Sequence, residues 1–180
     1  MIIYGLHSVF SFLKNRPDII KKVFIAPQIK PQLAQQFKNF LHKTVILSNH
    51  ELNTISKSND HQGICAEIDG FPYATLHDNY NTICILDHIE DPRNLGAIIR
   101  NALAFKIDCL IIPKDRASNL TPSAIKASAG AAAIIPIIKV SNINQIINQL
   151  KNNNYWVYGF EASGENKLSA IKFDAKSVLV

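Results

Sequence analysis

The sequence predicts an α/β protein built in two parts. Short apolar runs that are typical of strands alternate with segments whose apolar residues recur at helical spacing. A polar stretch with a glycine and a proline, at residues 70–81, interrupts this alternation. Beyond it the strand-like runs are continuously apolar, as expected for a parallel sheet with helices on both faces. At 180 residues the chain can form one ordinary domain or two small ones.

The first part, residues 1–70, mixes helix and strand patterns. Leu6, Val9, Phe10 and Leu13 recur at helical spacing and predict a helix near the start. The later patterns predict a strand at 21–26, an amphipathic helix at 32–43, a strand at 44–48, a short helix at 50–58 and a strand at 61–68. Helices and strands joined by such short connections predict a small α/β domain.

The second part, residues 82–180, has a clearer strand–helix rhythm and follows a predicted linker at 71–81. Strands are predicted at 82–89, 109–113, 135–140, 155–162 and 177–180. Helices are predicted at 94–105, 121–133 and 142–153, with Gly130 as a possible break in the second of them. Right-handed crossovers would make the strands parallel.

Polar residues follow the predicted strands at the positions where ligands bind in such folds. The stretches are "DHIEDPRN", "PKDRASN", "VSN" and "FEASGEN". In open α/β sheets, ligands bind beyond the carboxyl ends of the strands. We therefore expect the functional residues of the second part at this edge of the sheet.

The helix predicted at 94–105 carries a single arginine, Arg100. Asn94 is a plausible N-cap residue, because its side-chain oxygen can accept a hydrogen bond from the first turn. Helical geometry places Arg100 on the face of the smallest residues, Gly96, Ala97 and Ala104. Small neighbours leave room for another backbone, a ligand or a partner subunit. Arg100 is then either a solvent-exposed side chain or a bidentate ligand for a phosphate.

Other charged residues extend this expectation with alternatives of their own. Arg93, Lys114 and Arg116 could form a basic rim beside Arg100, or could simply be solvated. Glu161, Ser163 and Gly164 follow a predicted buried strand, where they could contact a small ligand or form a surface turn.

Composition and motifs exclude several classes of protein. The net charge of +5 is compatible with nucleic-acid contact but also with ordinary solubility. No apolar run approaches the roughly 20 residues of a membrane helix, and no signal peptide or metal-binding motif is evident. Cys65, Cys84 and Cys109 lie in apolar, strand-like settings, which predicts small buried side chains in a reducing cytoplasm.

Four segments together resemble the SpoU (TrmH) family of RNA ribose 2′-O-methyltransferases. They are "IYGLHSVFSFL", "HQGICAEI", "LDHIEDPRNLGAIIRNALAF" and "IIPKDRASNLTPSAIKASAGAAAIIPIIKV". The resemblance covers essentially the whole chain, and "DPRNLGAIIRNA" is its most specific motif. It is closest to the branch that methylates a guanosine ribose in 23S rRNA.

The resemblance implies an RNA substrate-binding domain at 1–70 and a SPOUT (α/β-knot) domain at 82–180. It implies S-adenosylmethionine as cofactor, RNA as partner (rRNA, or alternatively tRNA) and a homodimer whose subunits share the site. Asn94 and Arg100 match the family's catalytic residues, and Glu161, Ala162, Ser163 and Gly164 would edge the cofactor pocket. A guanidinium stays protonated, so Arg100 is expected to hold a phosphate and stabilise a developing alkoxide, not to act as a base.

The chain also departs from the family pattern at its end. The family continues with a loop containing glycine and glutamate and with an "SLNVSVA"-like segment that wraps the cofactor, and neither is present up to Val180. The expectation is therefore an incomplete SPOUT domain with weak cofactor binding and weak or absent catalysis. The alternatives are an RNA-binding module and a decayed fragment.

Overall fold

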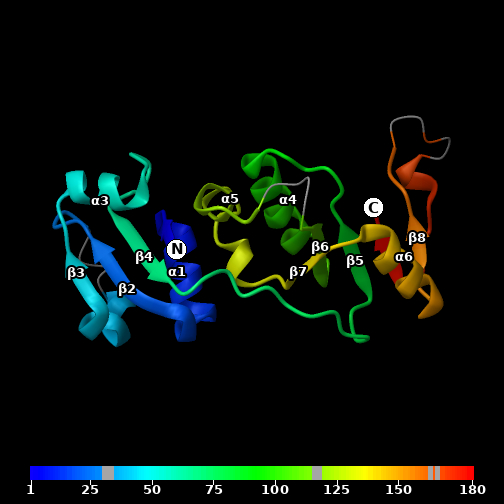
Figure 1. Cartoon of the computed structure of the whole chain (residues 1–180), viewed down its shortest axis with the longest axis horizontal. Coiled ribbons are helices and arrows are strands. Elements are labelled where there is room, and N and C mark those ends of the chain that lie inside the picture. Colours follow the sequence, from blue (N-terminus) through cyan, green and yellow to red (C-terminus); the bar gives the residue numbers. More distant parts are fainter. Residues whose placement is uncertain (30–34, 115–118, 162–163, 165–166) are drawn as a thin grey trace.

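The computed structural model describes residues 1–29, 35–114, 119–161, 164 and 167–180, which form two sheets along the molecule's long axis (Figure 1). The N-terminal unit (residues 1–70) holds one sheet, and the C-terminal unit (residues 82–180) holds the other. The chain crosses between them through residues 71–81. The combination of helices with a parallel second sheet confirms the predicted α/β class.

The sheet of the N-terminal unit has four strands in the order β1-β4-β2-β3. They are β1 (Ile2–Tyr4), β2 (Ile20–Ile25), β3 (Thr44–Ile46) and β4 (Ile64–Ile68). Strand β4 runs antiparallel to β1 and β2, whereas β3 runs parallel to β2. Strand β1 was not predicted from the sequence, because its three residues are too few to show a periodicity.

Two of the described helices of the N-terminal unit agree with the predictions, one is of another type, and the short one at Pro17–Ile19 was not predicted. These helices are α1 (Leu6–Asn15), α3 (Asn49–Ser56) and the short 3₁₀ helices η1 (Pro17–Ile19) and η2 (Gln35–Lys43). The segment predicted as an amphipathic helix at 32–43 is a 3₁₀ helix over its described part. The three-residue spacing of Phe37 and Phe40 fits both helix types, so the pattern could not distinguish them.

The C-terminal unit contains a five-stranded, wholly parallel sheet in the order β7-β6-β5-β9-β8. Its strands are β5 (Thr82–Ile85), β6 (Cys109–Pro113), β7 (Ile137–Val140), β8 (Trp156–Tyr158) and β9 (Ser177–Leu179). Strand β9 lies between β5 and β8. The carboxyl ends of these three strands, which are far apart in the sequence, therefore meet at one edge.

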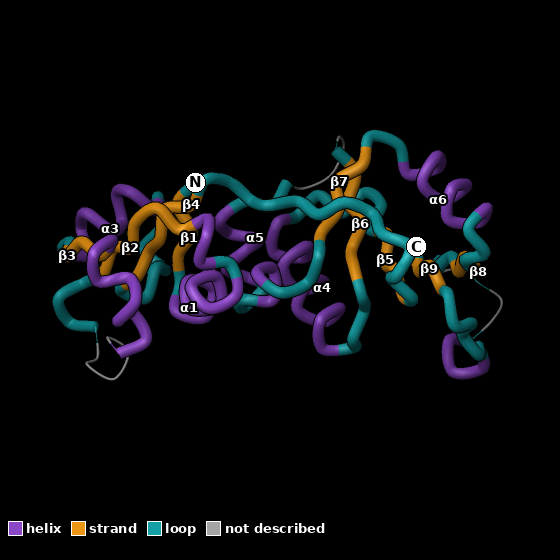
Figure 2. Tube along the Cα trace, turned by 90° about the horizontal axis from the view of Figure 1, so that it is seen from below, coloured by secondary structure: helices purple, strands orange, loops and turns teal. Residues whose placement is uncertain are grey.

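Helices cover both faces of this sheet, as the continuously apolar strands predict (Figure 2). The helices of this unit are α4 (Pro92–Ala104), α5 (Pro122–Ala127), α6 (Ile143–Asn152) and the 3₁₀ helices η3 (Ala131–Ala133) and η4 (Leu168–Ala170); α4 and α6 lie on opposite faces of the sheet. Leu110 and Ile112 of β6 belong to one apolar cluster with Leu95 and Ile99 of α4. Ile111, between them in the sequence, belongs to a second cluster with Leu150 of α6.

Residues 71–81 contact the C-terminal unit near both ends of this segment. The Ala74 amide donates to the Ile137 carbonyl over 2.8 Å, which adds a bridge to the outer side of β7. The Lys139 ammonium lies 5.2 Å from the centre of the Tyr73 ring. At the far end the Asp108 carboxylate accepts hydrogen bonds from the backbone amides of Asn81 and Thr82. This segment connects the two units and, at Ala74, lies along the outer edge of β7.

The three cysteines are free thiols in apolar surroundings. Burial raises the pKa of Cys65 and Cys84 to about 11 and that of Cys109 to about 12. The thiolate, which is the nucleophile, is therefore scarce near neutral pH. The prediction of small buried side chains is confirmed for Cys65 and Cys109, while Cys84 is half-buried. Among the described residues, no helix has the length and apolarity to cross a bilayer.

Candidate functional site

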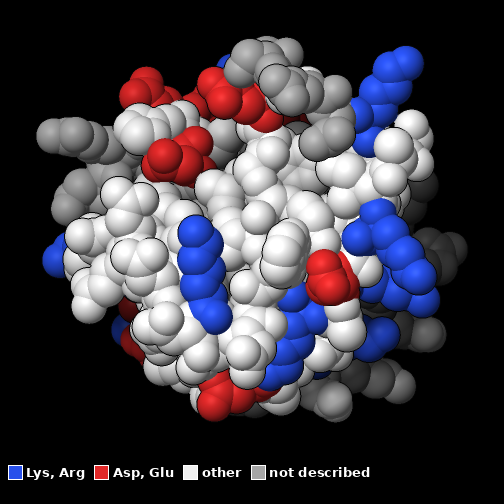
Figure 3. Space-filling model, turned by 90° about the vertical axis from the view of Figure 1, so that its right-hand side faces the viewer, with Lys and Arg blue, Asp and Glu red and all other residues white. Residues whose placement is uncertain are grey.

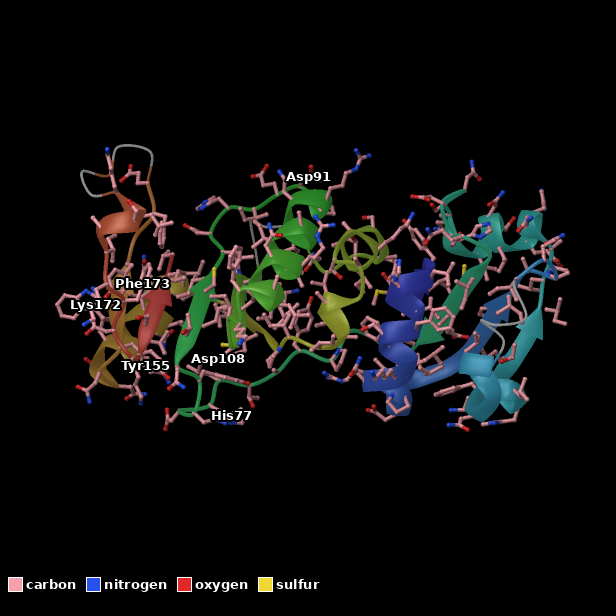
Figure 4. All side chains as sticks on the ribbon, turned by 180° about the vertical axis from the view of Figure 1, so that it is seen from behind. His77, Asp91, Asp108, Tyr155, Lys172 and Phe173 are labelled. Carbon is pink, nitrogen blue, oxygen red and sulfur yellow. The ribbon has the colours of Figure 1, made fainter. Side chains whose placement is uncertain are left out.

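The carboxyl edge of the parallel sheet collects the polar loops that the sequence singled out. Residues 86–91 follow β5, Lys114 follows β6, and Gly159 to Glu161 follow β8. Figure 4 shows Asp91 at the start of α4. Because neighbouring parallel strands end at the same edge, these loops form one candidate site.

Helix α4 begins earlier than predicted, which changes the role of Asn94. The N-cap residue is Asp91, whose carboxylate accepts a hydrogen bond from the Arg93 amide over 2.8 Å, and Pro92 occupies the first helical turn. The prediction of Asn94 as N-cap is therefore wrong. An aspartate followed by a proline is a stronger helix start than an asparagine three residues after that aspartate. Asn94 is instead an exposed residue of the first turn.

This assignment predicts different effects for two neighbouring substitutions. Asp91→Ala removes the cap and is expected to lower the free energy of unfolding by about 1 kcal/mol. Asn94→Ala removes no capping bond and is expected to change it by less than about 0.5 kcal/mol. Urea denaturation of both variants measures the difference. Equal losses would contradict the assignment of Asp91 as the cap.

Arg100 is exposed on α4, opposite the buried Leu95 and Ile99. Among the described residues, none forms a hydrogen bond or ion pair with its guanidinium. The side chain is therefore free to bind a ligand that arrives from outside, such as a phosphate group.

The small-residue face beside Arg100 is used by another helix of the same chain. Gly96 is buried, and a Cβ placed on it would lie 2.5 Å from both the Ala124 carbonyl oxygen and the Ala127 Cβ. The sequence left open whether another backbone, a ligand or a partner subunit approaches this face. At Gly96 it is the backbone of α5 that does so. Ala97 is half-buried and Ala104 is exposed.

Two of the three side chains beyond Arg100 that were predicted to form a basic rim belong to the described residues. Arg93 and Lys114 are exposed and follow the adjacent strands β5 and β6. Arg116 lies outside the described residues. The two described side chains place positive charge at the edge where α4 begins.

A hollow of about 680 Å³ opens where β5, β9 and β8 end. Its apolar lining comes from Cys84, Ile85, Leu86, Ile89, Phe160, Leu179 and Val180, with Gly159 and Gly164 beside them. Two carboxylates, Asp87 and Glu161, also line it. The backbone ladder continues past the strands here, since the Phe160 amide donates to the Val180 carbonyl over 2.8 Å.

The hollow includes two of the four residues predicted at this place and several that were not predicted. Glu161 and Gly164 line it, whereas Ala162 and Ser163 lie outside the described residues. Asp87 was singled out only as part of the stretch "DHIEDPRN", and Leu179 was missed. Leu179 offered no signal, because its place beside β5 depends on strand order. A larger hollow, of about 840 Å³, lies away from this edge between α1 and η2.

Two family models match the chain and together cover most of it. The model of the SpoU rRNA methylase family matches residues 81–180. The model for RNA 2′-O ribose methyltransferase substrate binding matches residues 2–74.

Curated relatives match over nearly the whole chain. The 23S rRNA (guanosine-2′-O-)-methyltransferase RlmB of Coxiella burnetii is 33% identical over 99% of this chain and 76% of that protein. RlmB of Nitrosomonas europaea is 29% identical over 94% of this chain and 69% of that protein.

Solved structures share the fold at lower sequence identity. The SpoU methyltransferase AviRb from Streptomyces viridochromogenes, in complex with AdoMet, superposes with a TM-score of 0.82 at 14% identity, over 99% of this chain and 71% of that one. The AdoMet-bound rRNA methyltransferase from Sinorhizobium meliloti has a TM-score of 0.77 at 22% identity, over 99% and 68%. The family models, the relatives and the shared fold agree with the motif around Arg100: the chain belongs to the SpoU rRNA methylase family.

Proposed function

We propose that this protein transfers a methyl group from S-adenosylmethionine to a ribose 2′-hydroxyl in RNA, and that its target is a guanosine of 23S rRNA. The observation that carries the proposal is the hollow at the β5–β9–β8 edge, beside the helix that presents Arg100. The RlmB relatives support the choice of reaction and of target.

The hollow has the size and chemistry that S-adenosylmethionine requires. Its volume of about 680 Å³ falls within the range of small-molecule sites, about 300–1,000 Å³. The apolar side chains suit an adenine ring, and the carboxylates of Asp87 and Glu161 suit the cationic part of the molecule. When bound, S-adenosylmethionine supplies the activated methyl group. We assign Glu161, Ala162, Ser163 and Gly164 to its binding, and we add Asp87.

Arg100 and Asn94 act on the RNA in this proposal. Arg100 binds the phosphate beside the target ribose through its planar guanidinium and stabilises the negative charge that develops on the attacking oxygen. It does not take the proton of the hydroxyl group, because a guanidinium remains protonated in proteins; that proton leaves to water as the oxygen accepts the methyl group. The exposed Asn94 amide can donate to and accept from the ribose, which orients it.

The RNA itself is bound through both units of the chain. We assign residues 1–70 as the substrate-binding domain, 71–81 as the linker and 82–180 as the SPOUT methyltransferase domain; the positions of the two family-model matches support this division. Arg93, Lys114 and Arg116 would contact phosphates near the target.

We also propose a homodimer with a site shared between subunits. Arg100 follows Asp91 by nine residues, which is about 13 Å along α4, so it lies well away from the loop that lines the hollow. A ribose at the mouth of one subunit's hollow can then be reached by Arg100 of the other. The end of the molecule formed by β8 and α6 exposes Trp156, Phe160, Leu168 and Phe173, and charged side chains lie among the uncharged ones on this face (Figure 3).

The 180-residue chain alone is proposed to bind S-adenosylmethionine weakly and to be a poor catalyst. The side chain of Phe160, at the rim of the hollow, is 50% exposed, and Glu161 and Gly164 are exposed as well. A cofactor in such an open site would keep much of its surface in water. The same observation favours a second candidate function, an RNA-binding module without catalysis.

Two measurements on the 180-residue chain test these proposals. Calorimetric titration with S-adenosylmethionine is expected to show a dissociation constant above about 100 μM, which corresponds to a binding free energy weaker than about −5.5 kcal/mol. Micromolar affinity would overturn weak binding. Affinity for 23S rRNA fragments is expected to fall steeply with salt. Transfer of labelled methyl groups to ribose separates the enzyme from the binding module, and absence of any salt-dependent RNA binding would contradict both.

A further inference from the structure

The contact between the two units centres on Gly130, which breaks the helical segment after α5. Gly130 has a φ of 93°, a left-handed conformation that favours glycine. A Cβ placed on it would lie 2.7 Å from the Ser11 Cβ and 2.8 Å from the His7 carbonyl oxygen. The Ser11 hydroxyl donates to the Gly130 carbonyl over 2.7 Å. Helix α1 of the N-terminal unit therefore rests directly on the backbone of the C-terminal unit.

A lysine on α5 forms a second connection between the units. The ammonium group of Lys126 pairs with the Asp60 carboxylate and donates to the Asp60 carbonyl over 2.6 Å. It also lies 5.7 Å from the centre of the Tyr4 ring. The Lys126 side chain is 20% exposed and the Asp60 side chain 77% exposed, so one partner of this pair is sheltered from water and the other is not.

Buried groups continue the contact between these two connections. The Ser8 side chain, 1% exposed, donates from its hydroxyl to the Ile125 carbonyl over 3.1 Å. A single apolar cluster includes Val9 and Phe12 of α1 together with Ala124 and Ile125 of α5. Interfaces that are apolar and fully hydrogen-bonded hold domains in one orientation. The two units share one core.

The opposite side of α5 contacts the helix that carries Arg100. Gly96 of α4 packs against the backbone of α5 at Ala124, one helical turn before Arg100. Figures 1 and 2 show α5 between the first sheet and α4. Helix α5 thus has the N-terminal unit on one side and the arginine helix on the other.

We propose that α5 and the turn at Gly130 fix the orientation of the N-terminal unit relative to Arg100, with Lys126 and Gly130 as positioning residues. The part of this inference that concerns RNA rests on the proposed function. An RNA held by the N-terminal unit is then presented to Arg100 at a set distance, which restricts the riboses that can reach it. Two RNA-contacting surfaces on one rigid body also bind without the loss of effective concentration that a flexible connection brings.

The first test measures whether the units tumble together and needs no RNA. Backbone ¹⁵N relaxation of the 180-residue chain is expected to give the same rotational correlation time for the N-terminal unit, measured at residues 2–68, as for the C-terminal unit, measured at residues 82–85 of β5. Lys126→Met keeps the apolar stem but removes the charge, and it is expected to shorten the correlation time of the N-terminal unit. Lys151→Met, on the exposed face of α6, is the matched control and should leave both values unchanged. Different correlation times in the wild-type protein would overturn the inference.

A second variant covers the case in which Lys126→Met does not separate the units. Gly130→Val forces a side chain into the space of Ser11 and is expected to separate them while each sheet keeps its own amide protection. If Gly130→Val leaves a single correlation time, the assignment of Gly130 as a positioning residue is wrong. If Gly130→Val unfolds the chain, the proposal is tested by comparing Lys126→Met with Lys126→Arg. The arginine variant retains the charge, so its two units are expected to tumble together as in the wild-type protein.

The RNA arm distinguishes failure of this inference from failure of the proposed function. For an rRNA fragment that the wild-type chain binds, Lys126→Met is expected to weaken affinity at least tenfold, whereas Lys151→Met and wild type should agree within twofold. Separate tumbling with unchanged RNA affinity would refute the positioning role. If the wild-type chain tumbles as one body but binds no RNA, the RNA part of the inference and the proposed function are both refuted. The inference that the two units form one rigid body is then unaffected.

Discussion

Replacing Arg100 with alanine is expected to lower whatever rate of methyl transfer to RNA the wild-type chain supports by about 10²–10³-fold, the effect of removing one preorganised group that stabilises developing charge. Thermal stability should not change, because Arg100 is exposed and no described residue pairs with it. Transfer of labelled methyl groups to rRNA, with mapping to the ribose, measures the rate. Asn101→Ala, at the next position of the same helix and also exposed, is the control.

Arg100→Lys separates the planar binding of a phosphate from positive charge alone. An ammonium is a point charge and cannot bind two phosphate oxygens in parallel, so the lysine variant should also be severely impaired. A rate near that of the wild-type protein would refute bidentate binding. Salt titration of RNA affinity provides a readout that does not depend on catalysis, and the slope for Arg100→Ala should fall by about one.

Gly96→Ala is expected to lower the free energy of unfolding by about 2 kcal/mol, the opposite of what helix propensity predicts. In an exposed helix, replacing glycine by alanine stabilises by about 0.5–1 kcal/mol. Here the new methyl group would lie 2.5 Å from the Ala124 carbonyl oxygen and from the Ala127 Cβ, and neither atom can move without its backbone. Overpacking of this kind costs about 1–3 kcal/mol, and a clash with backbone belongs at the upper end of that range. Subtracting the helix-propensity gain of about 0.5–1 kcal/mol leaves a net loss of about 2 kcal/mol.

Chemical denaturation measures this effect, with Asn101→Ala as the control on the same helix. The control should change stability by less than about 0.5 kcal/mol. A rise in stability for Gly96→Ala would show that α4 and α5 do not approach as closely as described. Because α5 also contacts α1, we further expect Gly96→Ala to lower the amide protection of Ser128, whose amide donates to Ala124.

Local pattern was sufficient for most of the secondary structure, and it failed where the signal was short or ambiguous. The apolar spacing in α1 and α6 and the apolar runs of β5 and β6 predicted these elements, because such patterns report which side chains are buried. Strand β1 was too short to show a pattern. At α4 the helical region was correct, but its start was misplaced because two capping residues, Asp91 and Asn94, were available.

The positions of the candidate site residues in the fold were predicted to a similar extent. Helical geometry placed Arg100 opposite the buried face of α4, and the structure agrees. The sequence also located the polar loops at the carboxyl ends of the strands. It did not reveal that Gly96 is covered by α5, because a small residue on a helix records only that something approaches, not what approaches.

By itself the sequence determined the class of fold, the family, the face of α4 that carries Arg100 and the break at Gly130. These follow from periodicity, from local backbone preference and from a motif, all of which are properties of short segments. Only the tertiary structure decided that β9 lies between β5 and β8, so that Asp87, Glu161 and Leu179 line one hollow. It alone showed that α5 joins the two units. Strand order and helix contacts depend on which distant surfaces bury each other, and local pattern does not encode that choice.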